Sequence, residues 1–235
     1  NYKFFPSPRL ILSGVDLEFG EDILNVENSE VDIVLNPLGI MNYRILDYNK
    51  FFIRGGLTNL EVNKINKLFY YIKKNRNKIN FKNNTIIFFS QNKKLFKIND
   101  SSVKFSSKNN SQQLVINGLF LNHKASFVLK DKNDKIINIS LKVPQLDIST
   151  NILIENIDNF KTFKGIINFE ILNNFFQFNL IKEKNITIDK GFVRSNLTNF
   201  SFEGDASFKP FFSFNFDVQR SSLDTKKLFL IIKQK

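Results

Sequence analysis

The chain has 235 residues, a formal net charge of +12 and a hydrophobic content of 42%, which fits one large folded domain or two small ones and excludes a disordered chain. It has no cysteine, which excludes disulfide bonds and cysteine-ligated zinc, and its single histidine excludes a multi-histidine metal site. The 28 phenylalanines, against only two alanines (Ala125 and Ala206), favour pleated sheet over a helical bundle.

The first 57 residues predict β-strands. Val31, Ile33 and Leu35 share one face with Asp32 opposite, as in a strand with one buried face, although Val34 interrupts the alternation. Ser13–Gly14 interrupts the alternation of the preceding strand and predicts a β-bulge. The carboxylate pairs Asp16/Glu18 and Glu30/Asp32 have the spacing of side chains on one strand face, so we expect them on the solvent face of the sheet.

Residues 58–76 break this pattern. Between Glu61 and Asn75 the apolar residues recur at spacings of three and four, which predicts a helix. A basic surface lies on and after this segment, and we interpret it as the wet face of that helix, with a nucleic-acid or membrane-surface patch as the alternatives. Its residues are Lys64, Lys67, Lys73, Lys74 and Arg76.

Residues 77–221 predict repeated strands of one long antiparallel meander. Apolar and polar residues alternate, and clusters of Asn, Asp, Gly and Lys recur every 8–12 residues or so. The expected turns include Asn83–Asn84, Asp131–Asp134, Asn173–Asn174 and Lys190–Gly191, and since only nine glycines are present, asparagine must supply many left-handed turn positions. Residues 222–235 predict a short helix or the start of another repeat.

The apolar side of these strands is the main candidate for a functional surface. It can line an open trough for acyl chains if the meander curls without closing, or it can form the core of a closed β-sandwich. Periodicity alone leaves both open. The candidate lining residues are Ile137, Ile139, Leu141, Phe176, Phe178, Ile186, Ile188, Phe212, Phe214 and Phe216.

The sequence shows no recognisable catalytic constellation. His123 lies between two predicted strands without an orienting carboxylate pattern, so we interpret it as a solvated turn residue. We find no glycine-rich phosphate loop and no nucleophile elbow, which makes a hydrolase the weakest of the hypotheses. We therefore expect a non-enzymatic protein without a cofactor or metal. The high positive charge comes from 28 lysines and only six arginines. This ratio fits AT-rich coding better than a protein specialised for binding phosphate groups, which would use more arginine, so we expect no nucleic acid as partner.

Several segments resemble AsmA-family proteins, which are bacterial, inner-membrane-anchored and periplasmic. The first resembles the segment that follows the family's membrane anchor, and the last two resemble the ending of its repeats. These segments are Phe5–Leu17, Ile23–Leu38, Ile53–Leu57, Phe202–Gly204, Lys209–Phe216 and Leu223–Leu228.

The resemblance implies a long sheet folded like a taco, similar to that of bridge-like lipid transfer proteins. It also implies a role in outer-membrane biogenesis, with phospholipid acyl chains as the partner in the groove. The chain opens without an initiator methionine, and its longest apolar run, Leu228–Ile232, is far shorter than the roughly 20 residues of a spanning helix. We therefore expect a piece of a longer protein, and the resemblance implies that its anchor to the inner membrane lies outside these residues.

Overall fold

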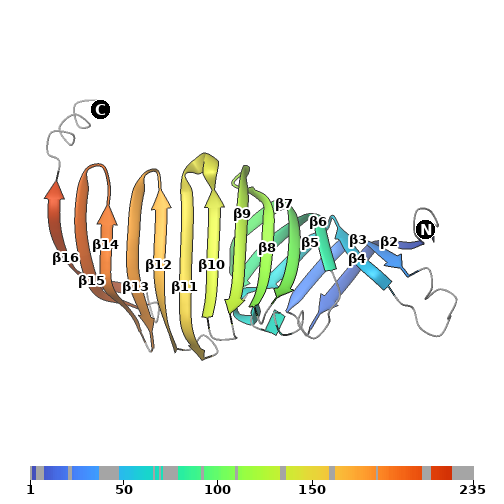
Figure 1. The fold of residues 1–235 in the computed structure, drawn as a ribbon, viewed down its shortest axis with the longest axis horizontal. Coiled ribbons are helices and arrows are strands. Elements are labelled where there is room, and N and C mark those ends of the chain that lie inside the picture. The colour runs from blue at the N-terminus through green and yellow to red at the C-terminus, as the bar shows by residue number, and fades with distance from the viewer. Residues whose placement is uncertain are drawn as a thin grey trace. The chain divides into compact units, whose positions relative to one another are not determined.

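The computed structural model describes residues 2–3, 8–20, 23–36, 48–65, 67–68, 70, 79–90, 93–108, 111–132, 136–158, 162–183, 185–207 and 213–223. The chain divides into two compact units, 1–128 and 129–235. Within the described residues, sixteen β-strands carry almost all of the regular structure (Figure 1). The prediction of a mainly β fold is therefore confirmed.

The first unit is a mixed sheet. Its neighbouring strands run in the order β1-β2-β3-β4-β6-β7-β8-β9, and β5 pairs with β3 and β6. Both β4 and β5 run parallel to β6, so the sheet is not antiparallel throughout, whereas β6, β7 and β8, which begin the meander predicted for 77–221, pair antiparallel in sequence order. The strands are β1 (Tyr2–Lys3), β2 (Arg9–Phe19), β3 (Leu24–Leu35), β4 (Tyr48–Arg54), β5 (Leu57–Glu61), β6 (Ile79–Ser90), β7 (Lys93–Lys108), β8 (Ser111–Phe120) and β9 (His123–Lys132), whose last four residues belong to the second unit.

The crossover between β5 and β6 helps to cover the apolar side of this sheet. It starts with a 3-10 turn, η1 (Val62–Lys64), and the next apolar side chains, Ile65 and Leu68, are buried. Residues 66, 69 and 71–75 lie outside the described part, so the helix expected over 61–75 stays a prediction. Phe88 is buried and stacks on the half-buried Phe96 with ring centroids 4.3 Å apart, so aromatic rings form part of the core of this unit.

A line of left-handed residues crosses the first unit from strand to strand. Gly14, Asn28, Gly55–Gly56, Asn83 and Asp100 all have positive φ. The register shifts between Leu12 and Val15, which confirms the bulge predicted at Ser13–Gly14. Asn83–Asn84, expected as a turn, lies instead inside β6 at such a shift. Asparagine suits both a turn and a β-bulge, because each requires a residue with positive φ.

Buried polar side chains stabilise the backbone along this line. The amide of Asn84 donates to the carbonyls of Ile53 and Lys82, at 3.1 and 3.0 Å. The hydroxyl of Ser101 donates to the carbonyl of Asn84 at 2.7 Å. These hydrogen bonds satisfy backbone carbonyl groups close to the break between β4 and β5. Without them the buried carbonyl groups would lack partners, which would destabilise the fold.

Asp32 corrects one sequence-based expectation. The residue is only 1% exposed and not on an open solvent face, because Arg9 and Arg54 both donate to its Oδ2 atom, at 3.1 and 2.9 Å. These partners lie 23 and 22 residues away in sequence, so the local pattern gave no sign of the ion pairs. The other carboxylate pair, Asp16 and Glu18, is exposed as expected.

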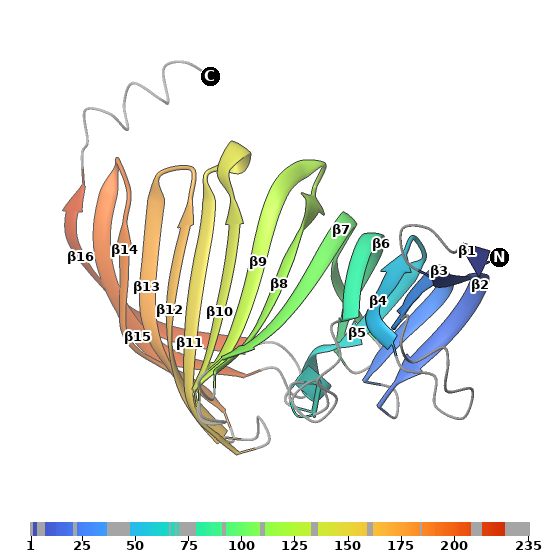
Figure 2. The same ribbon diagram turned by 45° about the vertical axis from the view of Figure 1, so that its right-hand side comes forward.

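The second unit is an antiparallel meander in which the sequential strands β10 to β16 each pair with the next. These strands are bowed along their length (Figure 2). They are β10 (Ile136–Val143), β11 (Ile148–Asp158), β12 (Thr162–Ile171), β13 (Asn174–Lys182), β14 (Ile186–Arg194), β15 (Thr198–Ser207) and β16 (Ser213–Leu223), with a 3-10 turn η2 (Pro144–Leu146) before β11. Lys190–Gly191 lies inside β14 and is not a turn. The helix or repeat expected from residue 222 falls, after Leu223, outside the described residues.

Two hairpin turns contain a leucine in an unfavourable conformation. Leu121–Asn122 connects β8 to β9 and Leu172–Asn173 connects β12 to β13, and all four residues have positive φ. Positive φ at both central residues defines a type I′ turn, which favours Asn, Asp and Gly. The leucine side chain gains little in return, since Leu121 and Leu172 are 67% and 66% exposed.

We therefore predict that Leu121→Asn and Leu172→Asn each raise the free energy of unfolding by about 1 kcal/mol, because asparagine tolerates the left-handed region better than leucine. Urea unfolding followed by circular dichroism measures the change. An unchanged or lower stability in both variants would contradict the strain assigned to these turns.

Candidate functional site

The candidate site is the apolar face of the β10–β16 sheet. Paired residues on neighbouring antiparallel strands point to the same side, so the register decides which side chains share a face. One such row is Ile139–Ile152–Ile167–Phe178, and another is Leu180–Ile188–Gly204–Phe216. Continuing these rows places apolar side chains from all seven strands on one side.

We call this set the apolar face. Its side chains are Ile137, Ile139, Leu141, Val143, Ile148, Ile152, Ile154, Phe163, Ile167, Phe169, Ile171, Phe176, Phe178, Leu180, Ile186, Ile188, Val193, Phe200, Phe202, Ala206, Phe214, Phe216 and Val218. The opposite side of the same strands carries mainly polar residues, such as Gln177, Glu203 and Asp217.

Most of the apolar face is only partly buried. Ile137, Val143, Ile154, Val193 and Ala206 are its buried members, whereas Phe214 and Val218 are 64% and 59% exposed. The remaining members are half-buried. In the first unit, by contrast, Phe88, Ile98 and Leu114 are fully enclosed. The described strands of the second unit all belong to one hydrogen-bonded sheet.

The predicted lining residues lie together on this face. Nine of them share it: Ile137, Ile139, Leu141, Phe176, Phe178, Ile186, Ile188, Phe214 and Phe216. Phe212 lies outside the described residues. Sequence reasoning missed other members, such as Ile152 and Ile154, because Leu153 between them is also apolar and hides the alternation.

Two glycines shape the aromatic end of the face. Gly191 pairs with Phe202, and Gly204 pairs with Phe216. A Cβ atom on Gly191 would lie 2.6 Å from two ring carbons of Phe202, and one on Gly204 would lie 2.7 Å from the Cδ1 atom of Phe216. The rings therefore lie over glycine backbone. The rings of Phe202 and Phe216, whose centroids are 5.7 Å apart, pack together and lie close to the backbone of the sheet.

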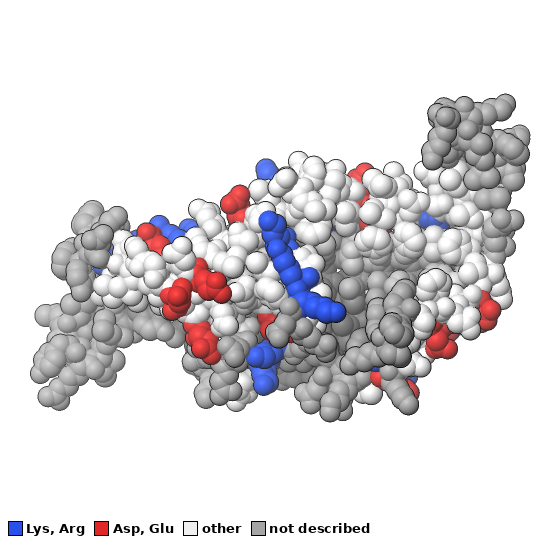
Figure 3. All heavy atoms as spheres, turned by 180° about the vertical axis from the view of Figure 1, so that it is seen from behind, with Lys and Arg blue, Asp and Glu red and all other residues white. Residues whose placement is uncertain are grey.

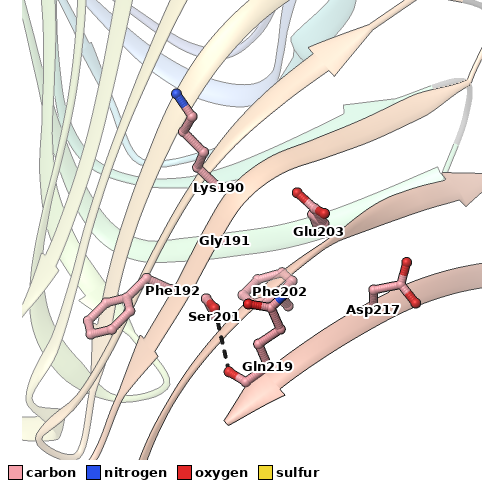
Figure 4. Close-up of a pocket in the computed structure, with 8 residues that line it drawn as sticks. All are labelled: Lys190, Gly191, Phe192, Ser201, Phe202, Glu203, Asp217 and Gln219. Carbon is pink, nitrogen blue, oxygen red and sulfur yellow. Dashed lines mark hydrogen bonds between the residues drawn. The ribbon is translucent and has the colours of Figure 1, made fainter. Parts of the chain in front are cut away.

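A hollow of about 350 Å³ lies over β14, β15 and β16, where mostly polar side chains surround it (Figure 4). Its side chains include Lys190, Phe192, Glu203, Asp217 and Gln219. Glu203 and Asp217 are directly paired across the strands. The Ser201 hydroxyl donates to the Gln219 carbonyl at 3.5 Å, so it makes a structural contact.

Among the described residues, no group of three or more His, Asp or Glu side chains could hold a metal ion. His123 is the first residue of β9 and is half-buried, directly after the Leu121–Asn122 turn. Nor does any helix within the described ranges have the length and apolarity to cross a bilayer.

The expected basic surface is only partly within the described residues. Lys64 lies in η1, Lys67 is exposed, and Lys73, Lys74 and Arg76 fall outside. Figure 3 shows basic and acidic side chains interspersed on one face of the described molecule, without one broad basic field. Comparison of the chain with protein-family models, curated proteins and solved structures finds no match.

We predict that Gly204→Ala lowers the free energy of unfolding by about 3 kcal/mol, because the new methyl group meets Phe216 and the φ of 153° suits glycine. Glu203→Ala, one residue away on the polar face, is the matched control and changes it by about 0.5 kcal/mol or less. Thermal and urea unfolding of both variants test this. Equal stability of the two would contradict the close packing described for Gly204.

Proposed function

We propose that the second unit holds lipid acyl chains against its apolar face, as part of a non-enzymatic protein that supports outer-membrane biogenesis. The observation that carries this proposal is the register, which places apolar side chains of seven strands on one side while most of them stay partly exposed. A large apolar surface without a covering layer marks a binding site for an apolar partner.

The dimensions of the face suit an acyl chain. Seven strands at a spacing of about 4.8 Å extend over about 29 Å, and strands of 8 to 11 residues are about 26 to 36 Å long. One leaflet of a bilayer contributes only about 15 Å of hydrocarbon thickness. Each methylene group that leaves water contributes about 0.8 kcal/mol, so the binding free energy of an acyl chain along the face is the sum of many small contributions.

The resemblance to the AsmA family supports the cellular setting of this proposal. It implies a periplasmic protein that is anchored to the bacterial inner membrane and carries a taco-like groove for phospholipid. The bowing of the β10–β16 strands favours such a groove, and an apolar lining suits transfer of lipid without chemistry.

The alternative function is a module that binds an anionic polymer, either nucleic acid or glycan, through lysine-rich surface. The net charge of +12 favours it. The described basic side chains support this alternative less than the net charge does. Arg9 and Arg54 bind Asp32, and Lys82 lies 5.5 Å from the ring centroid of Phe52. Binding to a polyanion would weaken steeply with added salt, whereas acyl-chain binding would not.

Native mass spectrometry and lipid extraction of the purified chain test the acyl-chain proposal. We predict co-purifying lipid, reduced at least tenfold in Phe178→Asp, because a carboxylate on the apolar face must be desolvated by a bound chain. Gln177→Asp is the matched control: it lies one residue away on the polar face and retains the lipid.

Circular dichroism and melting curves show that both variants are folded before they are compared. A folded wild-type chain that neither carries lipid nor takes up phospholipid from vesicles would overturn the proposal, as would equal lipid content in the two variants.

A further inference from the structure

The last strand of the second unit, β16, is the outermost strand of its sheet (Figures 1 and 2). It pairs with β15 along one edge, and no described strand pairs with its other edge. The backbone N–H and C=O groups along a free strand edge can bond a further strand. This edge is therefore a candidate surface for the addition of a strand.

The most exposed side chains of the apolar face lie on this same strand. Phe214 and Val218 are 64% and 59% exposed, whereas Ala206, the register partner of Phe214 on β15, is buried. Natural sheets commonly protect an edge strand with lysine or proline. Ser213–Gln219 contains neither residue, and Asp217 is its one charged side chain. The exposure of the apolar face is thus greatest where the described sheet ends.

A bulge limits the part of β16 that can accept a strand. The register between β15 and β16 shifts so that Ser221 is an extra residue in β16. A bulge of this kind bends an edge strand and interrupts regular pairing. The regular stretch before the bulge contains Ser213–Gln219, whose central residue is Phe216.

This stretch is self-complementary on its apolar side. A two-fold axis through Phe216 pairs two copies of the strand antiparallel, and it sets Phe216 opposite its own symmetry mate. The same axis sets Phe214 of each copy opposite Val218 of the other, so the two most exposed apolar side chains cover each other. Aromatic and β-branched side chains form favourable cross-strand pairs.

The polar side is complementary in the same register. Asn215 of each copy lies opposite Asp217 of the other, and an asparagine amide can donate to a carboxylate. Ser213 lies opposite Gln219, so no like charges meet. A two-fold axis through Asp217 would instead set two carboxylates opposite each other, which destabilises a strand pair.

We propose that β16 is an interface between two copies of this chain, in which the two β16 strands pair antiparallel about Phe216. A two-fold axis perpendicular to the sheet keeps the apolar sides of both copies on the same side. The seven strands of each copy then form one apolar surface, about 62 Å wide at about 4.8 Å per strand. The pairing depends on the strand edge alone and does not rest on lipid binding.

Cysteine cross-linking tests the register, because the chain has no cysteine of its own. Ser213 and Gln219 are exposed and lie about 20 Å apart along one strand, but they are opposite each other across the proposed pair. We expect the double variant Ser213→Cys/Gln219→Cys to form disulfide-linked dimers under mild oxidation. Each single variant should stay monomeric on a non-reducing gel, because its two cysteines lie too far apart to bond.

Circular dichroism establishes that all three variants are folded before they are compared. Absence of covalent dimer in the folded double variant would overturn the proposal. Cross-linking of either single variant to the same extent as the double variant would also overturn it, since contact would then occur in another register.

A pair of charge variants tests the interface without a covalent bond. Ser213→Lys/Gln219→Glu places opposite charges across the pair twice, whereas Ser213→Glu/Gln219→Glu places like charges there. The partners of these two positions on β15 are Ser207 and Ser201, so neither variant sets like charges opposite each other within one copy. We expect the association constant of the first to exceed that of the second about tenfold or more.

Sedimentation velocity over a concentration series measures both association constants and that of the wild-type chain. A wild-type chain that stays monomeric up to about 1 mM overturns the interface, as do equal association constants of the two charge variants. Lipid extraction of the same samples separates this result from the proposed function. A lipid-bound chain that is monomeric would overturn the interface alone.

Discussion

The apolar face depends on cross-strand register. A slip of one residue in any strand moves its apolar set to the other side of the sheet, so every neighbouring pair must agree. Strand β14 shows how strict this is. Ile188 and Val193 are five residues apart and would point to opposite sides in a regular strand. The bulge between Ile188 and Gly191, where Lys190 has a φ of 54°, supplies the extra residue that returns both to one side.

The same alternation of apolar and polar residues forms an enclosed core in the first unit and a partly exposed apolar face in the second. In the first unit the parallel pairing of β5 with β6 requires a crossover, and Ile65 and Leu68 of that crossover are buried. In the second unit every connection is five residues or shorter, because consecutive strands are antiparallel neighbours. Connections of this length are too short to fold back over the apolar face.

Sequence reasoning recovered what depends on local pattern. Alternation identified nine described residues that the register brings to one face, such as Ile139 and Phe178. It did not separate turns from bulges at Lys190–Gly191, since both require a left-handed residue. It also missed the burial of Asp32 and the parallel strands, because these depend on partners distant in sequence. Whether an apolar face is covered is likewise invisible to periodicity.

Leucine recurs every 25 or 26 residues in the second unit, at Leu146, Leu172, Leu197 and Leu223. This period suggests that the hairpin is the unit by which such a sheet is enlarged. Each hairpin of the second unit bonds only to its neighbours in the meander, as repeats do in a solenoid. Duplication of one hairpin in the gene would widen the sheet by two strands, about 10 Å, without disturbing a central core. The capacity of such a surface can therefore evolve in discrete steps, each set by a single duplication.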